Sequence, residues 1–119
     1  MKITPNELFS LLSDETRLRC LVLIQKEGKL CVCEICQLIE AIQPKISRHL
    51  ALMRKSGLVL DERRGQWVYY SLNPSLPDWA KRIIESTLEN LQKEEPYRLD
   101  LDKMSLLKKQ DICNILNSI

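Results

Sequence analysis

Three of the five cysteines of this chain lie within six residues, at Cys31, Cys33 and Cys36. Thiols three residues apart share one face of a helix, so a helix that begins at Val32 or Cys33 would let the sulfurs of Cys33 and Cys36 reach one ion. On the same continuous helix, Cys31 would point roughly 200° away from Cys33. Ligation of one ion by all three thiols is therefore expected to distort the first turn of this helix.

Three thiolates in a short arc suit a soft ion that accepts three ligands, and trivalent arsenic or antimony, As(III) or Sb(III), fits this description. A structural zinc site normally has four ligands, in pairs from two chain segments, and the further candidates Cys20, His49 and Cys113 lie outside the cluster. Cadmium, lead and bismuth also accept thiolates, and neighbouring thiols can form a disulfide. The residues favour a soft metalloid and leave these alternatives open.

The charge of the chain is segregated, although the net charge is only +2. From Ala41 to Val59 there are four basic residues and His49 but no acidic residue, whereas Glu85 to Glu95 carries four acids and one lysine. Such segregation indicates a basic face of the kind that binds nucleic acid.

The basic segment follows the cluster in a helix-turn-helix pattern. The cluster helix is expected to run to about Glu40, and a second helix from Pro44 to Ser56 is expected to end at Gly57. Apolar residues on one face of the second helix would face the core, which leaves the opposite face for a DNA major groove. The expected DNA contacts are Gln43, Lys45, Ser47 and Arg48, with His49 at the border as a packed residue or phosphate contact.

Two β-rich runs, Leu58–Leu60 and Trp67–Leu72, surround a polar turn and predict a hairpin. Because the hairpin follows a helix-turn-helix, we interpret it as the wing of a winged helix. Arg63 and Arg64 at its tip would reach phosphate or the minor groove.

The remaining segments predict a buried helix that begins after Asp14 and includes Cys20. They also predict two helices that form a dimer interface between two copies of the chain. A capping box, Thr4-Pro5-Asn6-Glu7, begins the first helix. The helix from Asp78 to about Lys93 has an apolar stripe too wide for a monomer to cover, so we expect it to pair with the first helix across a two-fold axis. We therefore divide the chain into a winged helix-turn-helix DNA-binding and dimerisation domain, 1–93, and a C-terminal tail with a short extra helix, 94–119.

Length and composition fit one globular domain, with 119 residues, 45% apolar and 29% charged. We find no apolar run long enough for a membrane span and no signal peptide pattern. The odd, clustered cysteines indicate a reducing compartment, so we expect a cytoplasmic protein. An enzyme such as a thiol arsenate reductase is disfavoured, because no glycine-rich phosphate loop opens a helix and Cys31 is not followed by an arginine six residues later.

Four segments together resemble the ArsR family of metalloregulatory repressors, in its arsenical-responsive branch. They are DETR at 14–17, LCVCEIC at 30–36, QPKISRHLALMR at 43–54 and RGQWVYY at 64–70. Two positions depart from the family pattern: Lys29 stands where glutamate is frequent, and Ile42 replaces a polar helix cap. The terminal segment also lacks the aspartate and histidine pattern that relatives use for zinc.

The resemblance implies a fold that is mainly α with a β-hairpin, a homodimeric winged helix-turn-helix that is not an enzyme. It further implies a transcriptional repressor that binds operator double-stranded DNA without metal and releases it when arsenite or antimonite binds Cys31, Cys33 and Cys36. The resemblance identifies neither the operator sequence nor the role of Cys113.

Overall fold

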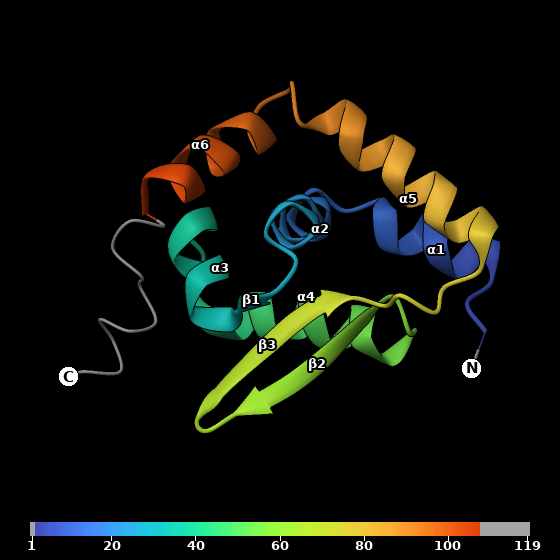
Figure 1. Cartoon of the computed structure of the whole chain (residues 1–119), viewed down its shortest axis with the longest axis horizontal. Coiled ribbons are helices and arrows are strands. Elements are labelled where there is room, and N and C mark those ends of the chain that lie inside the picture. Colours follow the sequence, from blue (N-terminus) through green and yellow to red (C-terminus); the bar gives the residue numbers. More distant parts are fainter. Residues whose placement is uncertain (1, 108–119) are drawn as a thin grey trace.

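The computed structural model describes residues 2–107. Its described part is mainly helical with a small antiparallel sheet, which confirms the predicted fold class (Figure 1). The elements are α1 (Pro5–Leu12), α2 (Glu15–Glu27), β1 (Leu30–Cys31), α3 (Val32–Ile39), α4 (Gln43–Lys55), β2 (Val59–Arg64), β3 (Trp67–Leu72), α5 (Asp78–Leu91) and α6 (Tyr97–Leu107).

Helix α2 forms the centre of the molecule, and Figure 1 looks along it. It contacts all five other helices of the described chain and strands β1 and β3. Five consecutive residues, from Cys20 to Ile24, are buried, so the prediction of a buried helix that includes Cys20 is confirmed. Asp14 caps the helix by accepting a hydrogen bond from the backbone N–H of Arg17 at 3.0 Å.

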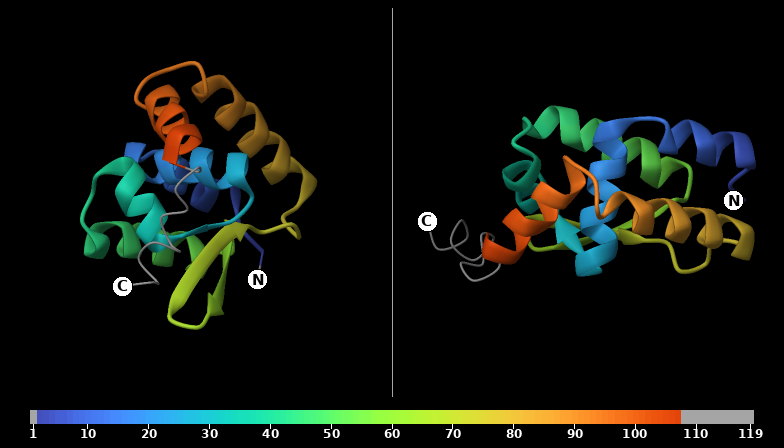
Figure 2. Two further views of the ribbon diagram at one scale, coloured as in Figure 1. Left: turned by 60° about the vertical axis from the view of Figure 1, so that its left-hand side comes forward. Right: turned by 90° about the horizontal axis from the view of Figure 1, so that it is seen from above.

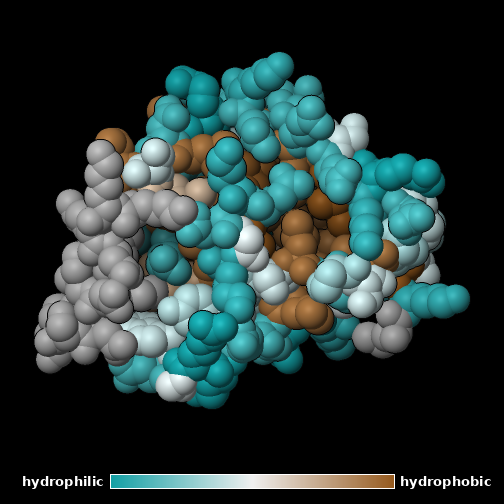
Figure 3. All heavy atoms as spheres, in the orientation of Figure 1, coloured by the Kyte–Doolittle hydropathy of each residue, from teal (hydrophilic) through white to brown (hydrophobic). Residues whose placement is uncertain are grey.

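The other elements lie on two sides of α2. Helices α5 and α6 cover one side, and α4 with the hairpin covers the other, as both Figure 1 and the left view of Figure 2 show. Apolar side chains come to the surface in the middle of the face shown in Figure 3, where α2 lies between α5 and β3. In residues 2–107, no helix is long and apolar enough to cross a lipid bilayer.

The capping box at the start of α1 is confirmed. The backbone N–H of Glu7 donates to Thr4 Oγ1 at 3.2 Å, and the backbone N–H of Thr4 donates to Glu7 Oε1 at 2.9 Å. These bonds satisfy two donors that a helix N-terminus otherwise leaves open.

The sheet has the strand order β1-β3-β2 with antiparallel neighbours. The hairpin register runs from Val59 opposite Leu72 to Arg64 opposite Trp67, which confirms the predicted hairpin. Strand β1 adds a third strand to the predicted hairpin, with Cys31 opposite Tyr69. The first cysteine of the cluster is thereby joined to the wing.

The helix-turn-helix is formed by α3 and α4. Helix α3 ends at Ile39, and its C-cap residue Glu40 has a left-handed backbone with φ of 59°. Helix α4 begins at Gln43, one residue before the predicted start, and its N-cap Ile42 gives no side-chain hydrogen bond. The core face was predicted correctly, because Ile46, Leu50 and Met53 are fully buried.

Two details at the C-terminal side differ from the sequence interpretation. Pro77 is the N-cap of α5, so Asp78 is its first helical residue rather than its cap. Helix α6 buries Tyr97, Asp100 and Met104, so this part of the predicted tail packs on the core. The division of the chain at residue 93 stays a prediction, and the last part of the predicted tail, with Cys113, lies outside the described residues.

Candidate metal centre and nucleic-acid interface

Cys31 lies at the junction of two elements. It is the last residue of β1 and the N-cap of α3, and its side chain is fully buried. Its backbone N–H donates to Glu34 Oε1 at 3.0 Å, in a capping box of the same type as the one at Thr4. Any displacement of Cys31 must therefore disturb both the start of α3 and the pairing with Tyr69 on β3.

Cys33 and Cys36 lie one turn apart on α3, and both are half-buried. Their side chains line one cavity of about 450 Å³ between α3, the start of α4 and β3. The cavity is also lined by Gln37, Gln43, Gln66 and Trp67. The prediction that Cys33 and Cys36 share a face of the helix is thus confirmed.

The thiols of this region are held in their protonated form. Burial raises the pKa of Cys33 to about 11, and the negative charge of Glu34 acts in the same direction. Burial also raises the pKa of Cys36, and it raises the pKa of Cys20 in the core to about 12. Ligation of a metal or metalloid at Cys33 and Cys36 therefore releases protons.

The structure brings two of the three predicted ligands together. Within residues 2–107, no group of three or more His, Cys, Asp or Glu side chains is placed to hold one metal ion. Cys33 and Cys36 share the cavity, whereas Cys31 is buried at the strand end. Cys33 and Cys36 offer two sulfur donors of the kind that a thiophilic ion prefers, and residues 2–107 do not form a ready four-ligand zinc site.

Helix α4 presents the predicted DNA contacts on its outer face. Gln43, Lys45 and Arg48 are exposed and Ser47 is half-buried, while the opposite face of the helix is in the core. An exposed polar and basic face at the N-terminal half of a second helix has the geometry of a major-groove reader.

The side chain of His49 contacts Arg17 on α2. Its Nδ1 lies 3.2 Å from Nη1 of Arg17, and Arg17 also donates to the carbonyl oxygen of Leu11 at 2.8 Å. Because a guanidinium can only donate, Nδ1 of His49 must accept and the ring is neutral. Burial lowers the pKa of His49, in agreement with this arrangement. The structure places the ring against the α1–α2 junction, as expected for a packed residue.

The wing carries the two predicted arginines. Arg63 and Arg64 are exposed at the end of β2, before a turn at Gly65 with φ of 61°. Arg64 lies 3.5 Å from Glu62 and its guanidinium stands 5.9 Å from the ring centre of Tyr69. Sequence reasoning missed that Glu62 also receives a hydrogen bond of 2.6 Å from Lys29, because the two residues are far apart in the sequence.

A helix-turn-helix with a basic outer face, followed by a hairpin with arginines at its tip, defines a winged-helix DNA-binding protein. A family model described as "Bacterial regulatory protein, arsR family" matches residues 14–60, which cover α2, the cysteine cluster and α4. The chain belongs to the ArsR family, whose members are DNA-binding transcription regulators rather than enzymes.

Several known proteins are similar over most of the chain. The arsenic resistance transcriptional regulator ArsR2 of Pseudomonas putida is 54% identical over 87 residues, which are 73% of this chain and 76% of the relative. The arsenical resistance operon repressor of Escherichia coli is 52% identical over 83 residues, 70% of this chain and 71% of the relative. Among solved structures, HlyU of Vibrio cholerae has a TM-score of 0.60 and 28% identity, and the match covers 73% of this chain and 86% of HlyU.

Proposed function

We propose that the protein is a cytoplasmic transcriptional repressor of arsenical resistance genes that senses arsenite or antimonite through Cys31, Cys33 and Cys36. Binding of the metalloid would release the repressor from operator DNA. Two relatives that are more than half identical carry names of arsenical resistance regulators. The observation that carries the proposal is the position of Cys31, which is both the N-cap residue of α3, the helix that carries Cys33 and Cys36, and the strand partner of Tyr69 in the wing.

Operator binding would use α4 and the wing together. Gln43, Lys45, Ser47 and Arg48 would contact the major groove, and each good bidentate base contact is worth about 1–3 kcal/mol of discrimination. Arg63 and Arg64 would bind phosphate or the minor groove, which adds affinity that depends on salt. His49 would act through Arg17 and the packing of α4 rather than as a base contact.

Release would follow from the conflict between ligation and helix capping. A bound trivalent metalloid supplies three positions for sulfur. To reach it, Cys31 must leave the N-cap position, so its N–H loses Glu34 and its pairing with Tyr69 is disturbed. Helix α3 packs on α4 and on β3, so both DNA-binding elements are affected. Such coupling is typically 1–3 kcal/mol, which changes DNA affinity about 5- to 150-fold.

A homodimer would supply two reading helices for a palindromic operator. Trp79 and Ile83 on α5 are only partly buried, and Phe9 on α1 is 56% exposed. Helices α1 and α5 lie toward the same end of the molecule in Figure 1 and in the right view of Figure 2. We propose that this apolar surface is the two-fold interface, and a monomer in sedimentation at micromolar concentration would contradict it.

A mobility-shift experiment on the DNA upstream of the protein's own gene tests the sensing proposal. Arsenite should release the wild-type protein, and the Cys31→Ser and Cys33→Ser variants should bind the same DNA but resist release. If the variants lose DNA binding itself, the cluster is structural. Parallel additions of cadmium, lead and bismuth show whether another thiophilic ion is the inducer.

A further inference from the structure

One wall of the cysteine cavity belongs to the wing. Trp67 and Gln66 line the same cavity as Cys33 and Cys36, which lie on α3. Trp67 is also the first residue of β3 and pairs with Arg64 on the other strand of the hairpin. A ligand held by the two thiols therefore lies next to the DNA-binding wing as well as next to the sensor helix.

Trp67 carries an unsatisfied hydrogen-bond donor. Its Nε1 is out of reach of solvent and is the one buried side-chain nitrogen or oxygen in residues 2–107 for which no hydrogen-bond partner is found. Buried polar groups are almost always bonded, so an unpaired donor in a residue that lines the cavity calls for an explanation. The amide side chains of Gln37 and Gln43 line the same cavity, which thus joins two sulfurs to several polar groups.

The chemistry of the ligand supplies an acceptor. Arsenite at neutral pH is arsenic bonded to three hydroxyls. When Cys33 and Cys36 react, two As–S bonds form and two As–O bonds break, and each thiol proton leaves with a hydroxyl as water. Arsenic stays trivalent and keeps one hydroxyl until a third thiol arrives. Because Cys31 is buried at the strand end, a stage with two thiols is the first that the structure allows.

We propose that Trp67 is a ligand-contacting residue of the thiol site, and that its indole N–H donates a hydrogen bond to the hydroxyl that arsenic retains while it is bound by Cys33 and Cys36. This inference rests on the proposed arsenite sensing and adds a residue of the wing to it. The indole must turn toward the cavity to make this bond. The first stage of binding then engages a residue of β3 before Cys31 leaves its cap.

The Cys31→Ser variant isolates this stage, because it lacks the third thiol. In that background, Trp67→Phe keeps an aromatic ring and removes only the N–H. We expect arsenite affinity, measured from the ultraviolet absorbance of the arsenic–sulfur bonds, to fall roughly 3- to 10-fold, the range of one hydrogen bond. Tyr69→Phe is the matched control, since it removes a hydroxyl from the same strand outside the cavity wall, and it should leave the affinity unchanged.

A second ligand makes the test specific. Monomethylarsonous acid has a methyl group where arsenite keeps its hydroxyl, so Trp67→Phe should not weaken its binding. Equal loss for both ligands, or loss for neither, would overturn the inference. If the Phe variant does not fold, the tryptophan emission of the Cys31→Ser protein still decides, because arsenite should change it more than the methyl compound does. Failure of the wild-type protein to bind arsenite would instead overturn the proposed function.

Discussion

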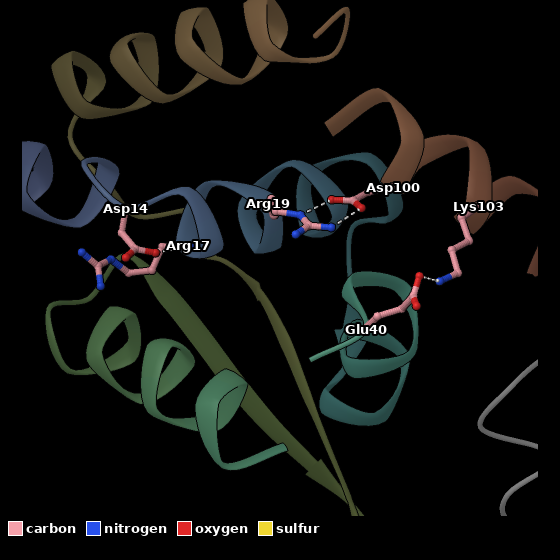
Figure 4. Close-up of polar contacts among 6 residues, drawn as sticks. All are labelled: Asp14, Arg17, Arg19, Glu40, Asp100 and Lys103. Carbon is pink, nitrogen blue, oxygen red and sulfur yellow. Dashed lines mark hydrogen bonds and ion pairs between the residues drawn. The ribbon is translucent and has the colours of Figure 1, made fainter. Parts of the chain in front are cut away.

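Arg19 on α2 and Asp100 on α6 form a two-point ion pair. The Nε and Nη2 atoms of Arg19 donate to the two carboxylate oxygens of Asp100, each at 2.7 Å, and the Asp100 side chain is only 5% exposed (Figure 4). The hydrogen bonds to this carboxylate raise the pKa of Arg19. The pair attaches α6 to the central helix, and a second pair, Lys103 to Glu40 at 2.8 Å, attaches α6 to the end of α3.

The first prediction concerns this pair. Asp100→Asn should lower the free energy of unfolding by about 3–5 kcal/mol, because it leaves the Arg19 guanidinium poorly paired at a mostly buried position. Urea unfolding measures the change. Asp102→Asn is the control, since its pair with Arg98 is exposed and should contribute less than about 1 kcal/mol. Similar effects of the two variants would show that α6 is not held by this contact.

The second prediction tests the division of the chain at residue 93. A chain of residues 1–93 loses Tyr97, Asp100 and Met104 from the core. We expect it to bind operator DNA, since α4 and the wing are retained, but to unfold at lower urea concentration than Asp100→Asn. Loss of all operator binding by a folded 1–93 chain would mean that the tail belongs to the DNA-binding domain.

The third prediction concerns the two capping boxes. Glu34→Ala removes the acceptor for the N–H of Cys31 and should lower the free energy of unfolding by about 0.5–2 kcal/mol. It should also reduce the arsenite concentration needed to release DNA, because Cys31 is then easier to displace. Glu7→Ala removes the equivalent acceptor at Thr4 and should leave the arsenite response unchanged. An equal shift of the arsenite concentration needed to release DNA in both variants would indicate general destabilisation.

The fourth prediction is a pH dependence. Burial lowers the pKa of His49 below its usual 6.5, with Arg17, Lys45 and Arg48 adding to the effect and Asp14 opposing it. The unfolded chain then binds more protons than the folded one below about pH 6.5. The contribution of His49 to the free energy of unfolding is therefore complete above about pH 6.5 and is lost as the pH falls below that value. His49→Gln keeps a hydrogen-bond acceptor and should remove this part of the slope. Unfolding at several pH values compares the two proteins, and parallel curves would contradict the neutral ring.

The fifth prediction separates base contacts from phosphate contacts. Arg48→Ala should cost about 1–3 kcal/mol of operator binding and relax the preference for one base pair. Arg63→Ala should weaken binding about equally on all sequences. It should also reduce the number of counterions released on DNA binding, read from the salt dependence of the affinity, by about one. Fluorescence anisotropy at several salt concentrations, with operator and scrambled DNA, distinguishes these two patterns.

The sequence alone determined the features that depend on neighbours in the chain. The capping box at Thr4, the core faces of α2 and α4, the hairpin and the shared face of Cys33 and Cys36 all follow from residue spacing within one element. Local spacing decides them because a helix or a hairpin turn joins residues only a few positions apart. The four motifs that indicated the ArsR family are likewise contiguous.

The tertiary structure alone decided what depends on contacts between distant elements. The pairing of Cys31 with Tyr69, the bond of Arg17 to His49, the pair of Arg19 with Asp100 and the cavity shared by Trp67 and the cysteines join residues about 30 to 80 positions apart. No local periodicity encodes such contacts, because the loops and packing of the whole chain bring their members together. The position of Cys31 between the sensor helix and the wing is thus a property of the folded chain.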